Sequence, residues 1–129
     1  MTESPNSTWT DDQIIQCIHH WAVEAGNVGL DADRYNEIND KYFVPCAEIL
    51  KARGAASLAK LLPLLEDGNP EVRLTAAGIA YEADIPRCRK VLENLMKTPD
   101  RIGLLAWATV AAKEPGNAPK PSELWGNRL

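Results

Sequence analysis

The sequence lacks the motifs of the common catalytic classes. It has no GxSxG motif of serine hydrolases, no glycine-rich phosphate loop and no HExxH zinc motif. Its only histidines, His19 and His20, are adjacent, and adjacent side chains on a helix point about 100° apart, so one helix face cannot present both to a metal ion. We therefore predict no catalytic residues, no metal site and no cofactor, and we expect a protein that is not an enzyme.

The sequence also lacks any apolar run near the roughly 20 residues that a membrane helix needs. Its first residues have neither the basic start nor the apolar stretch of a secretory signal. Its three cysteines, Cys17, Cys46 and Cys88, form no CxxC pair, which argues against a zinc knuckle or a redox motif. We expect a cytoplasmic protein without membrane contact, whose cysteines are small buried hydrophobic residues.

Hydrophobic residues make up 45% of the 129 residues and charged residues 25%, which is the balance of one ordinary globular domain. We expect residues 1–10 to be a flexible polar lead and residues 11–115 to form a single helical domain. Residues 116–129 are rich in Gly, Pro and Asn, with one large apolar anchor at Trp125. We expect this tail to pack on the last helix; a dimer partner covering that helix is the alternative.

Apolar residues recur at helical spacing in six segments, which predicts an all-α fold of about six helices. The first helix begins with the acids Asp11 and Asp12 as its cap. The second spans about residues 31–54 and contains Pro45. Because its apolar stripe keeps its phase through the proline, we favour one kinked helix; two short helices broken before Pro45 are the alternative.

Four further helices follow in the second half of the chain. Leucines predict a third helix, with Pro63 close to its end. Asn69 is predicted to cap the fourth helix, with Pro70 in its first position. This helix is apolar on two faces and is therefore expected to lie between other elements. The fifth is predicted to open at Asp84 and the sixth at Asp100, and the sixth is apolar almost all round.

The second half of the chain matches itself when shifted by 30 residues. Such a period, with two helices in each unit, is typical of an α-solenoid, in which stacked hairpins bury what one hairpin cannot. The coincident apolar pairs are Leu61 with Val91, Leu62 with Leu92, Leu65 with Leu95, Val72 with Ile102, Leu74 with Leu104, Ala76 with Ala106 and Ala80 with Val110.

The stretch LLPLLEDGNPEVRLTAA resembles a HEAT repeat, in which a leucine-rich helix, often with a proline, precedes an Asp turn and a helix opening with Val-Arg. The resemblance implies a short HEAT-like α-α superhelix in which Asp67 and Arg73 tie the turn together. A surface ion pair contributes only about 0–1 kcal/mol, so this pair has a structural role at most. The second copy has Ile102-Gly103 in place of Val-Arg, and we interpret it as an atypical terminal repeat.

The chain as a whole, over about residues 11–115, resembles a small bacterial family catalogued as a domain of unknown function, family number two thousand and nineteen. The stretches that carry this resemblance are RYNEINDKYFVPCAEILKARG, PEVRLTAAGIAYEADIP and GLLAWATVAAKEP. The family implies a compact HEAT-like helical fold and brings no established activity.

Charge is unevenly distributed along the chain. Residues 1–50 carry nine acids and two bases, a net −7, whereas residues 51–129 carry nine acids and twelve bases, a net +3. This asymmetry favours a protein-interaction module with a basic protein partner, of the inhibitor or immunity type. With a pI of about 5.2, nucleic acid is not the expected partner. The candidate interaction surface comprises Asp31, Asp33, Glu37, Asp40, Arg87 and Lys90.

Two other classes of function stay open. A small-ligand-binding protein or an enzyme would have its site between helices, near Trp21, Tyr35, Tyr42 or His19, although such aromatics are more often part of a core. A self-associating structural subunit would form a homodimer through the apolar sixth helix, which carries Trp107.

Overall fold

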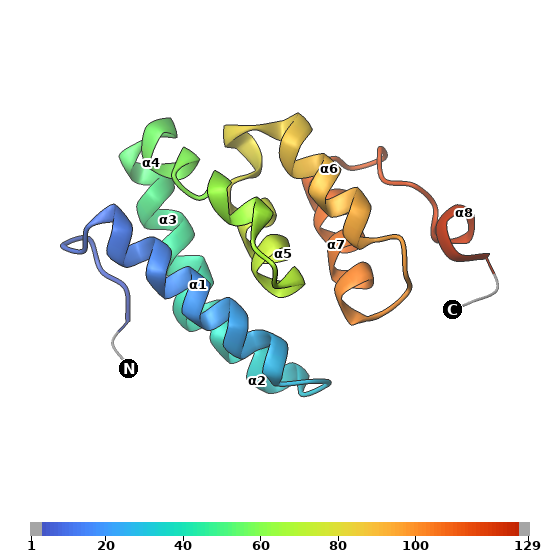
Figure 1. Cartoon of the computed structure of the whole chain (residues 1–129), viewed down its shortest axis with the longest axis horizontal. Helices are drawn as coiled ribbons and strands as arrows, with labels where there is room; N and C mark the ends of the chain where they lie inside the picture. The colour runs from blue at the N-terminus through green and yellow to red at the C-terminus, as the bar shows by residue number, and fades with distance from the viewer. Residues whose placement is uncertain (1–3, 127–129) are drawn as a thin grey trace.

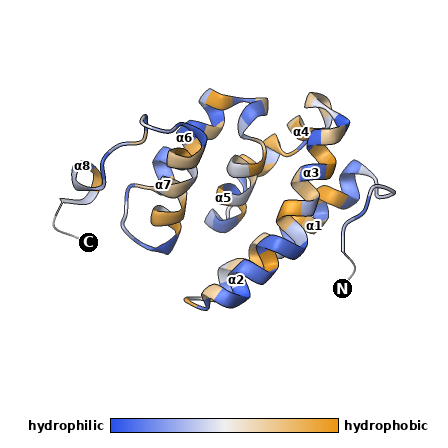
Figure 2. Cartoon of the chain, turned by 180° about the vertical axis from the view of Figure 1, so that it is seen from behind, coloured by the Kyte–Doolittle hydropathy of each residue, from blue (hydrophilic) through white to orange (hydrophobic). Residues whose placement is uncertain are grey.

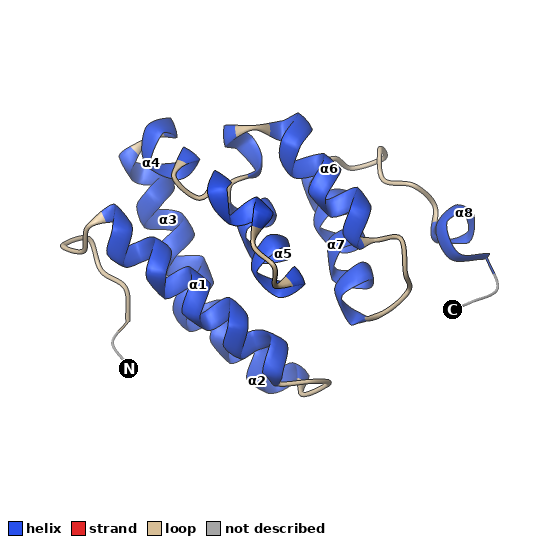
Figure 3. Cartoon of the chain, viewed as in Figure 1, coloured by secondary structure: helices blue, strands red, loops and turns tan. Residues whose placement is uncertain are grey.

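The computed structural model describes residues 4–126, and every regular element in that range is a helix (Figure 3). The predicted all-α fold is confirmed. In chain order the elements are α1 Asp11–Asn27, α2 Ala32–Ile38, the π-helical turn η1 Asn39–Phe43, α3 Val44–Arg53, α4 Ala55–Ala59, the 3₁₀ helix η2 Leu62–Glu66, α5 Pro70–Ile79, the 3₁₀ turn η3 Tyr81–Ala83, α6 Ile85–Leu95, α7 Arg101–Lys113 and α8 Pro121–Trp125.

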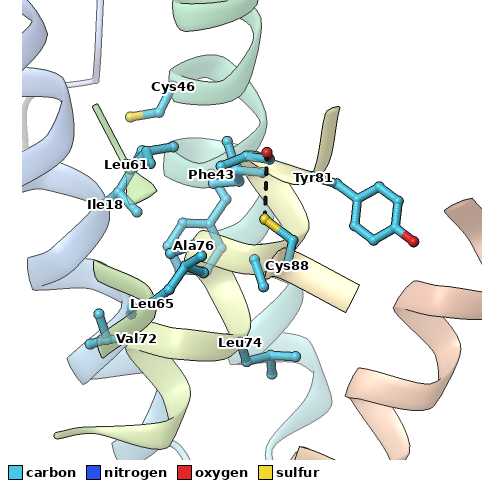
Figure 4. Close-up of a cluster of buried hydrophobic side chains, with 14 of the residues drawn as sticks. Ile18, Phe43, Cys46, Leu61, Leu65, Val72, Leu74, Ala76, Tyr81 and Cys88 are labelled. Carbon is cyan, nitrogen blue, oxygen red and sulfur yellow. Dashed lines mark hydrogen bonds between the residues drawn. The ribbon is translucent and has the colours of Figure 1, made fainter. Parts of the chain in front are cut away.

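Helix α5 lies in the middle of the fold (Figure 1). It contacts α1 and η2 on one side and α6 and α7 on the other. Val72 and Leu74 leave it on different sides, and both are buried (Figure 4). The prediction of a middle element is confirmed, because a helix with two apolar faces needs cover on both.

The second predicted helix is continuous, as the uninterrupted helical backbone from Ile38 to Val44 shows. It begins at Asp31, whose carboxylate accepts a hydrogen bond from the Arg34 amide at 3.0 Å, and it ends at Gly54, whose φ of 112° favours glycine. The kink expected at Pro45 takes the form of the π turn η1, in which the Val44 amide bonds back to the Asn39 carbonyl. The one-helix interpretation was therefore correct.

The start of α1 differs from the prediction. Thr10, not the Asp11-Asp12 pair, caps the helix, because its hydroxyl accepts from the Gln13 amide while the Gln13 side chain reaches back to the Thr10 amide. Asp11 instead binds three side chains of the α3–α4 corner: Arg53 at 2.7 Å, Ser57 at 2.8 Å and Lys60 at 3.0 Å. Arg53 also donates to the carbonyls of Ser7 and Trp9, which attaches this part of the N-terminal lead to α3.

Replacing Asp11 with Asn is expected to make the free energy of unfolding depend less on pH at acidic pH. The hydrogen bond from Arg53, followed by those from Ser57 and Lys60, lowers the pKa of Asp11 from 3.8 to about 2. A lowered pKa means that the ionised carboxylate stabilises the fold above pH 4 or so, and that this contribution is lost as the pH falls toward about 2.

Urea unfolding measured between about pH 6 and about pH 2.5 checks this expectation. The difference in unfolding free energy between the wild type and Asp11→Asn should shrink as the pH falls. The neighbouring exposed acid provides the control, since Asp12→Asn should leave the profile of the wild type unchanged. A difference that stays constant over this pH range would contradict the assigned role of Asp11.

The third predicted helix is broken into α4 and η2, which corrects the single helix expected there. Pro63 lies at the start of the 3₁₀ segment, because proline has no N–H to donate and its ring clashes with the carbonyl four residues earlier. Leu61 and Leu65 are nevertheless buried, at 0% and 3% exposure, so the break leaves the leucine stripe in the core.

The remaining helix starts follow the local sequence. Asn69, Asp84 and Asp100 each accept a hydrogen bond from a backbone amide in the first turn of α5, α6 and α7, respectively. These three predicted caps are confirmed. Side chains at such positions satisfy amides that would otherwise lack partners.

Residues paired by the 30-residue shift are only partly equivalent in their packing. The hairpin of η2 and α5 packs beside that of α6 and α7, and the pairs Ala76 with Ala106 and Ala80 with Val110 are all 0% exposed. Leu74 is 5% exposed whereas its counterpart Leu104 is 43% exposed. Among the described residues, the surface of α7 at Leu104 is therefore left partly uncovered.

Two tryptophans, one in the last hairpin and one in the tail, join these two parts of the chain. The indole N–H of Trp107 in α7 donates to the Pro119 carbonyl, and that of Trp125 in α8 donates to the Met96 carbonyl, both at 2.7 Å. Trp125 is 3% exposed. Its burial attaches α8 to the end of α6.

Candidate functional site

Two adjoining hollows lie between α2–η1 and α7, and α5 lines the smaller of them. Their volumes are about 200 Å³ and 320 Å³, and Tyr35 and Leu105 line both, so the hollows meet at these two residues. We call the two hollows together the α5 groove. Its other lining residues are Gly29, Leu30, Asp31, Ala32, Asn36 and Arg101 in the larger hollow, and Asn39, Phe43, Leu74, Thr75, Gly78, Ile79 and Thr109 in the smaller one.

Small side chains on α5 and α7 leave the groove open. Gly78 has no side chain, and a Cβ atom there would lie 3.6 Å from the Thr109 methyl group, an ordinary contact. Thr75 and Thr109 donate their hydroxyls to carbonyls of their own helices, Glu71 at 2.9 Å and Leu105 at 2.8 Å. The protons of these hydroxyls are therefore already used, and Leu74 and Ile79 add apolar surface beside them.

An ion pair lies beneath one end of the groove. Glu71 is 1% exposed and binds the guanidinium of Arg101, which lies 5.6 Å from the centre of the Tyr35 ring. Burial raises the pKa of Tyr35, and the Glu71 charge raises it further, against the opposing effect of Arg101. Within residues 4–126, Glu71 Oε2 and Arg101 Nη1 have no hydrogen-bond partner. The stability of this end therefore depends on one charge-assisted contact.

The mouth of the groove is acidic on one side. Asp31 lines it, and Asp33, Glu37 and Asp40 are exposed on the adjoining α2 and η1. Figure 2 shows α2 coloured largely as hydrophilic. We call Asp31, Asp33, Glu37 and Asp40 the acidic strip. Leu30, which precedes Asp31 in the chain, is 91% exposed.

The two predicted basic members of the interaction surface lie elsewhere. Arg87 and Lys90 belong to α6, which packs against α5 and α7, whereas α2 packs against α1 and η1 (Figure 1). Arg87 binds Glu66 at 2.9 Å. The fold therefore groups the four acids but does not bring the two bases to them.

Comparison with protein-family models, with curated proteins and with solved structures found no match. Among residues 4–126, no three His, Cys, Asp or Glu side chains are grouped as a metal site requires. In the same range, no helix has the length and apolar character needed to cross a bilayer.

The predicted turn residues Asp67 and Arg73 are joined through the backbone. Arg73 donates to the Asp67 carbonyl at 2.8 Å, while the Asp67 carboxylate accepts from the Asn69 amide at 2.9 Å and contacts His19 Nε2 at 3.0 Å. The Asn69 amide, with smaller help from His19, lowers the pKa of Asp67. These contacts hold the turn between η2 and α5 against α1.

Of the aromatic residues considered for a ligand site, only Tyr35 lines the α5 groove. Trp21 and Tyr42 stack on each other in the core, with ring centres 4.0 Å apart and planes inclined by 8°. Glu71 and Arg101 were not predicted from the sequence as site residues. A signal was present, because Arg101 occupies the first turn of a helix, where the helix dipole disfavours a positive charge unless an acid compensates it.

Proposed function

We propose that this chain is a non-catalytic protein-interaction module that binds a basic protein through the acidic strip. The observation that carries the proposal is the exposed acidic strip beside an apolar groove, with Leu30 fully accessible at its mouth. Exposed apolar surface with a charged rim is characteristic of protein interfaces, and charge complementarity selects the partner and speeds association.

The partner class follows from the charge. An inhibitor or immunity-type protein masks a basic surface of its target, and an acidic strip suits that role. We further propose that the hairpins are HEAT-like repeats and that the partner is met in a reducing cytoplasm. The side-by-side hairpins and the three free, buried cysteines support these two statements.

Affinity purification from the source cells, with this chain as bait, is expected to recover a basic protein. Its binding should weaken by at least about tenfold between about 50 mM and about 500 mM salt, because salt screens exposed charges. The double variant Asp33→Asn, Asp40→Asn should weaken binding similarly. It leaves Asp31, which caps α2, in place.

A matched control neutralises two exposed acids outside the strip, Asp12→Asn and Glu48→Gln, and should leave binding unchanged. Binding that is insensitive to salt, an acidic partner, or equal loss in both double variants would contradict the proposal.

A further inference from the structure

We propose that the α5 groove binds an extended segment of the partner, whose main chain is held by Asn36 and Asn39 and whose apolar side chain enters the smaller hollow, beside Gly78. This inference rests on the proposed function and adds to it the docking site and the form of the docking segment. The segment carries Lys or Arg beside its apolar residue.

The size of the groove favours single side chains. Pockets for drug-sized ligands occupy roughly 300–1,000 Å³. The two hollows, of about 200 Å³ and 320 Å³, are at or below the lower end of that range, and they follow one another with Tyr35 and Leu105 between them. A chain laid along them places one side chain in each hollow, as the alternate side chains of an extended segment do.

The two asparagines match the repeat of such a segment. They lie three residues apart on one helix, so their Cβ atoms are about 5–6 Å apart on the same face. Same-facing residues of an extended chain repeat every 6.6 Å or so. Each carboxamide offers both a donor and an acceptor, which pair with the N–H and C=O of one residue of the segment.

The side-chain amide of Asn39 is available for this exchange. Within residues 4–126, its only hydrogen bond is a long one to Asp40, at 3.4 Å. Asn36 is exposed at the surface. A bound main chain thus gains these bonds without breaking strong ones.

Charge beside the groove selects basic residues. The two arginines near the groove are already paired, Arg34 with Glu37 and Arg101 with Glu71. Of the remaining acids, Asp31 lines the larger hollow, and Asp33 and Asp40 are exposed on the adjoining α2 and η1. They favour Lys or Arg in the positions that flank the apolar side chain.

The test starts from a phage-displayed library of random peptides about twelve residues long, selected against the full chain. Fluorescein-labelled copies of the enriched peptides are then titrated by fluorescence polarisation. The first variant is Gly78→Leu, whose side chain fills the groove. Its matched control is Ala52→Leu, which places the same side chain in a separate hollow beside Glu48 and Arg53.

Enriched peptides are expected to share an apolar residue flanked by Lys or Arg. Gly78→Leu and the double variant Asn36→Ala, Asn39→Ala should each weaken their binding at least tenfold or so, and Ala52→Leu should not. The asparagine variant changes only surface side chains, so it remains informative if Gly78→Leu fails to fold, which circular dichroism reports. Failure of either folded variant to weaken binding, or the absence of enriched peptides, overturns the inference.

The two proposals fail in distinguishable ways. If the purified basic partner binds Gly78→Leu and the wild type equally while the acidic-strip variant loses binding, the groove inference is wrong and the proposed function stands. If no basic partner binds the wild type, the proposed function fails and the inference that rests on it fails too.

Discussion

Replacing Arg101 with Met is expected to lower the free energy of unfolding by about 3 kcal/mol, the lower end of the cost of breaking a buried ion pair. Glu71 is 1% exposed, so the variant leaves a carboxylate buried without its charged partner. Because the Arg101 side chain itself is 24% exposed, a larger cost is not expected. Urea unfolding at neutral pH, followed by circular dichroism, measures the loss.

Two further variants show whether the loss arises because a carboxylate is left buried without a partner, or simply because an arginine charge is removed. Arg87→Met removes an arginine whose ion pair with Glu66 is exposed, and it should cost no more than about 1 kcal/mol. Adding Glu71→Gln to Arg101→Met should recover most of the loss, because no buried charge remains. If Arg101→Met cost as little as Arg87→Met, the pair beneath the groove would not stabilise the fold.

The second large effect is expected at Gly103, where alanine should destabilise the protein by about 2–4 kcal/mol, combining overpacking with a weakened cap. A Cβ atom at this position would lie 1.8 Å from the backbone oxygen of Thr98, far inside contact distance. The backbone turn before α7 would have to move. That movement would disturb the bond from the Gly103 amide to the Asp100 carboxylate, at 2.7 Å.

Gly78→Ala is the matched control, since it is the same substitution near the C-terminal end of another helix. Its Cβ would meet only the Thr109 methyl group, at 3.6 Å, so the helix propensity of alanine should stabilise the protein by about 0.5–1 kcal/mol. Thermal and urea unfolding of both variants give the comparison. Equal effects at Gly78 and Gly103 would rule out the Thr98 contact as the cause.

Features that depend on neighbouring residues could be predicted from the sequence. The caps at Asn69, Asp84 and Asp100 follow from short polar side chains placed before helical patterns. The central position of α5 follows from its two apolar faces. At α1 the preference for short polar residues at the helix cap does not decide between Thr10 and Asp11, because both are good caps. The reciprocal bond from Gln13 favours Thr10.

Features that join distant segments could not be predicted in this way. The α5 groove depends on Tyr35 and Leu105, which lie 70 positions apart and meet only when two helices flank α5. In the 30-residue match, Gly103 stands where the first copy has Arg73. The structure gives a physical reason for it, which is that the Thr98 carbonyl occupies the space a side chain would need.

The π turn at Asn39–Phe43 determines the direction in which the recognition side chains point. The turn contains one residue more than a regular α-helical turn. The side chains of α2 are therefore rotated about the helix axis by roughly 100° relative to those of α3, compared with a uniform α-helix. Tyr35 and Asn36 thereby line the groove while Cys46 and Leu50, farther along the same helix, stay in the core. Deleting one residue from this turn would restore a uniform helix and swing the docking side chains aside by about a quarter of a revolution. The number of residues in this turn, as much as their chemistry, therefore decides where the side chains of the proposed docking site lie.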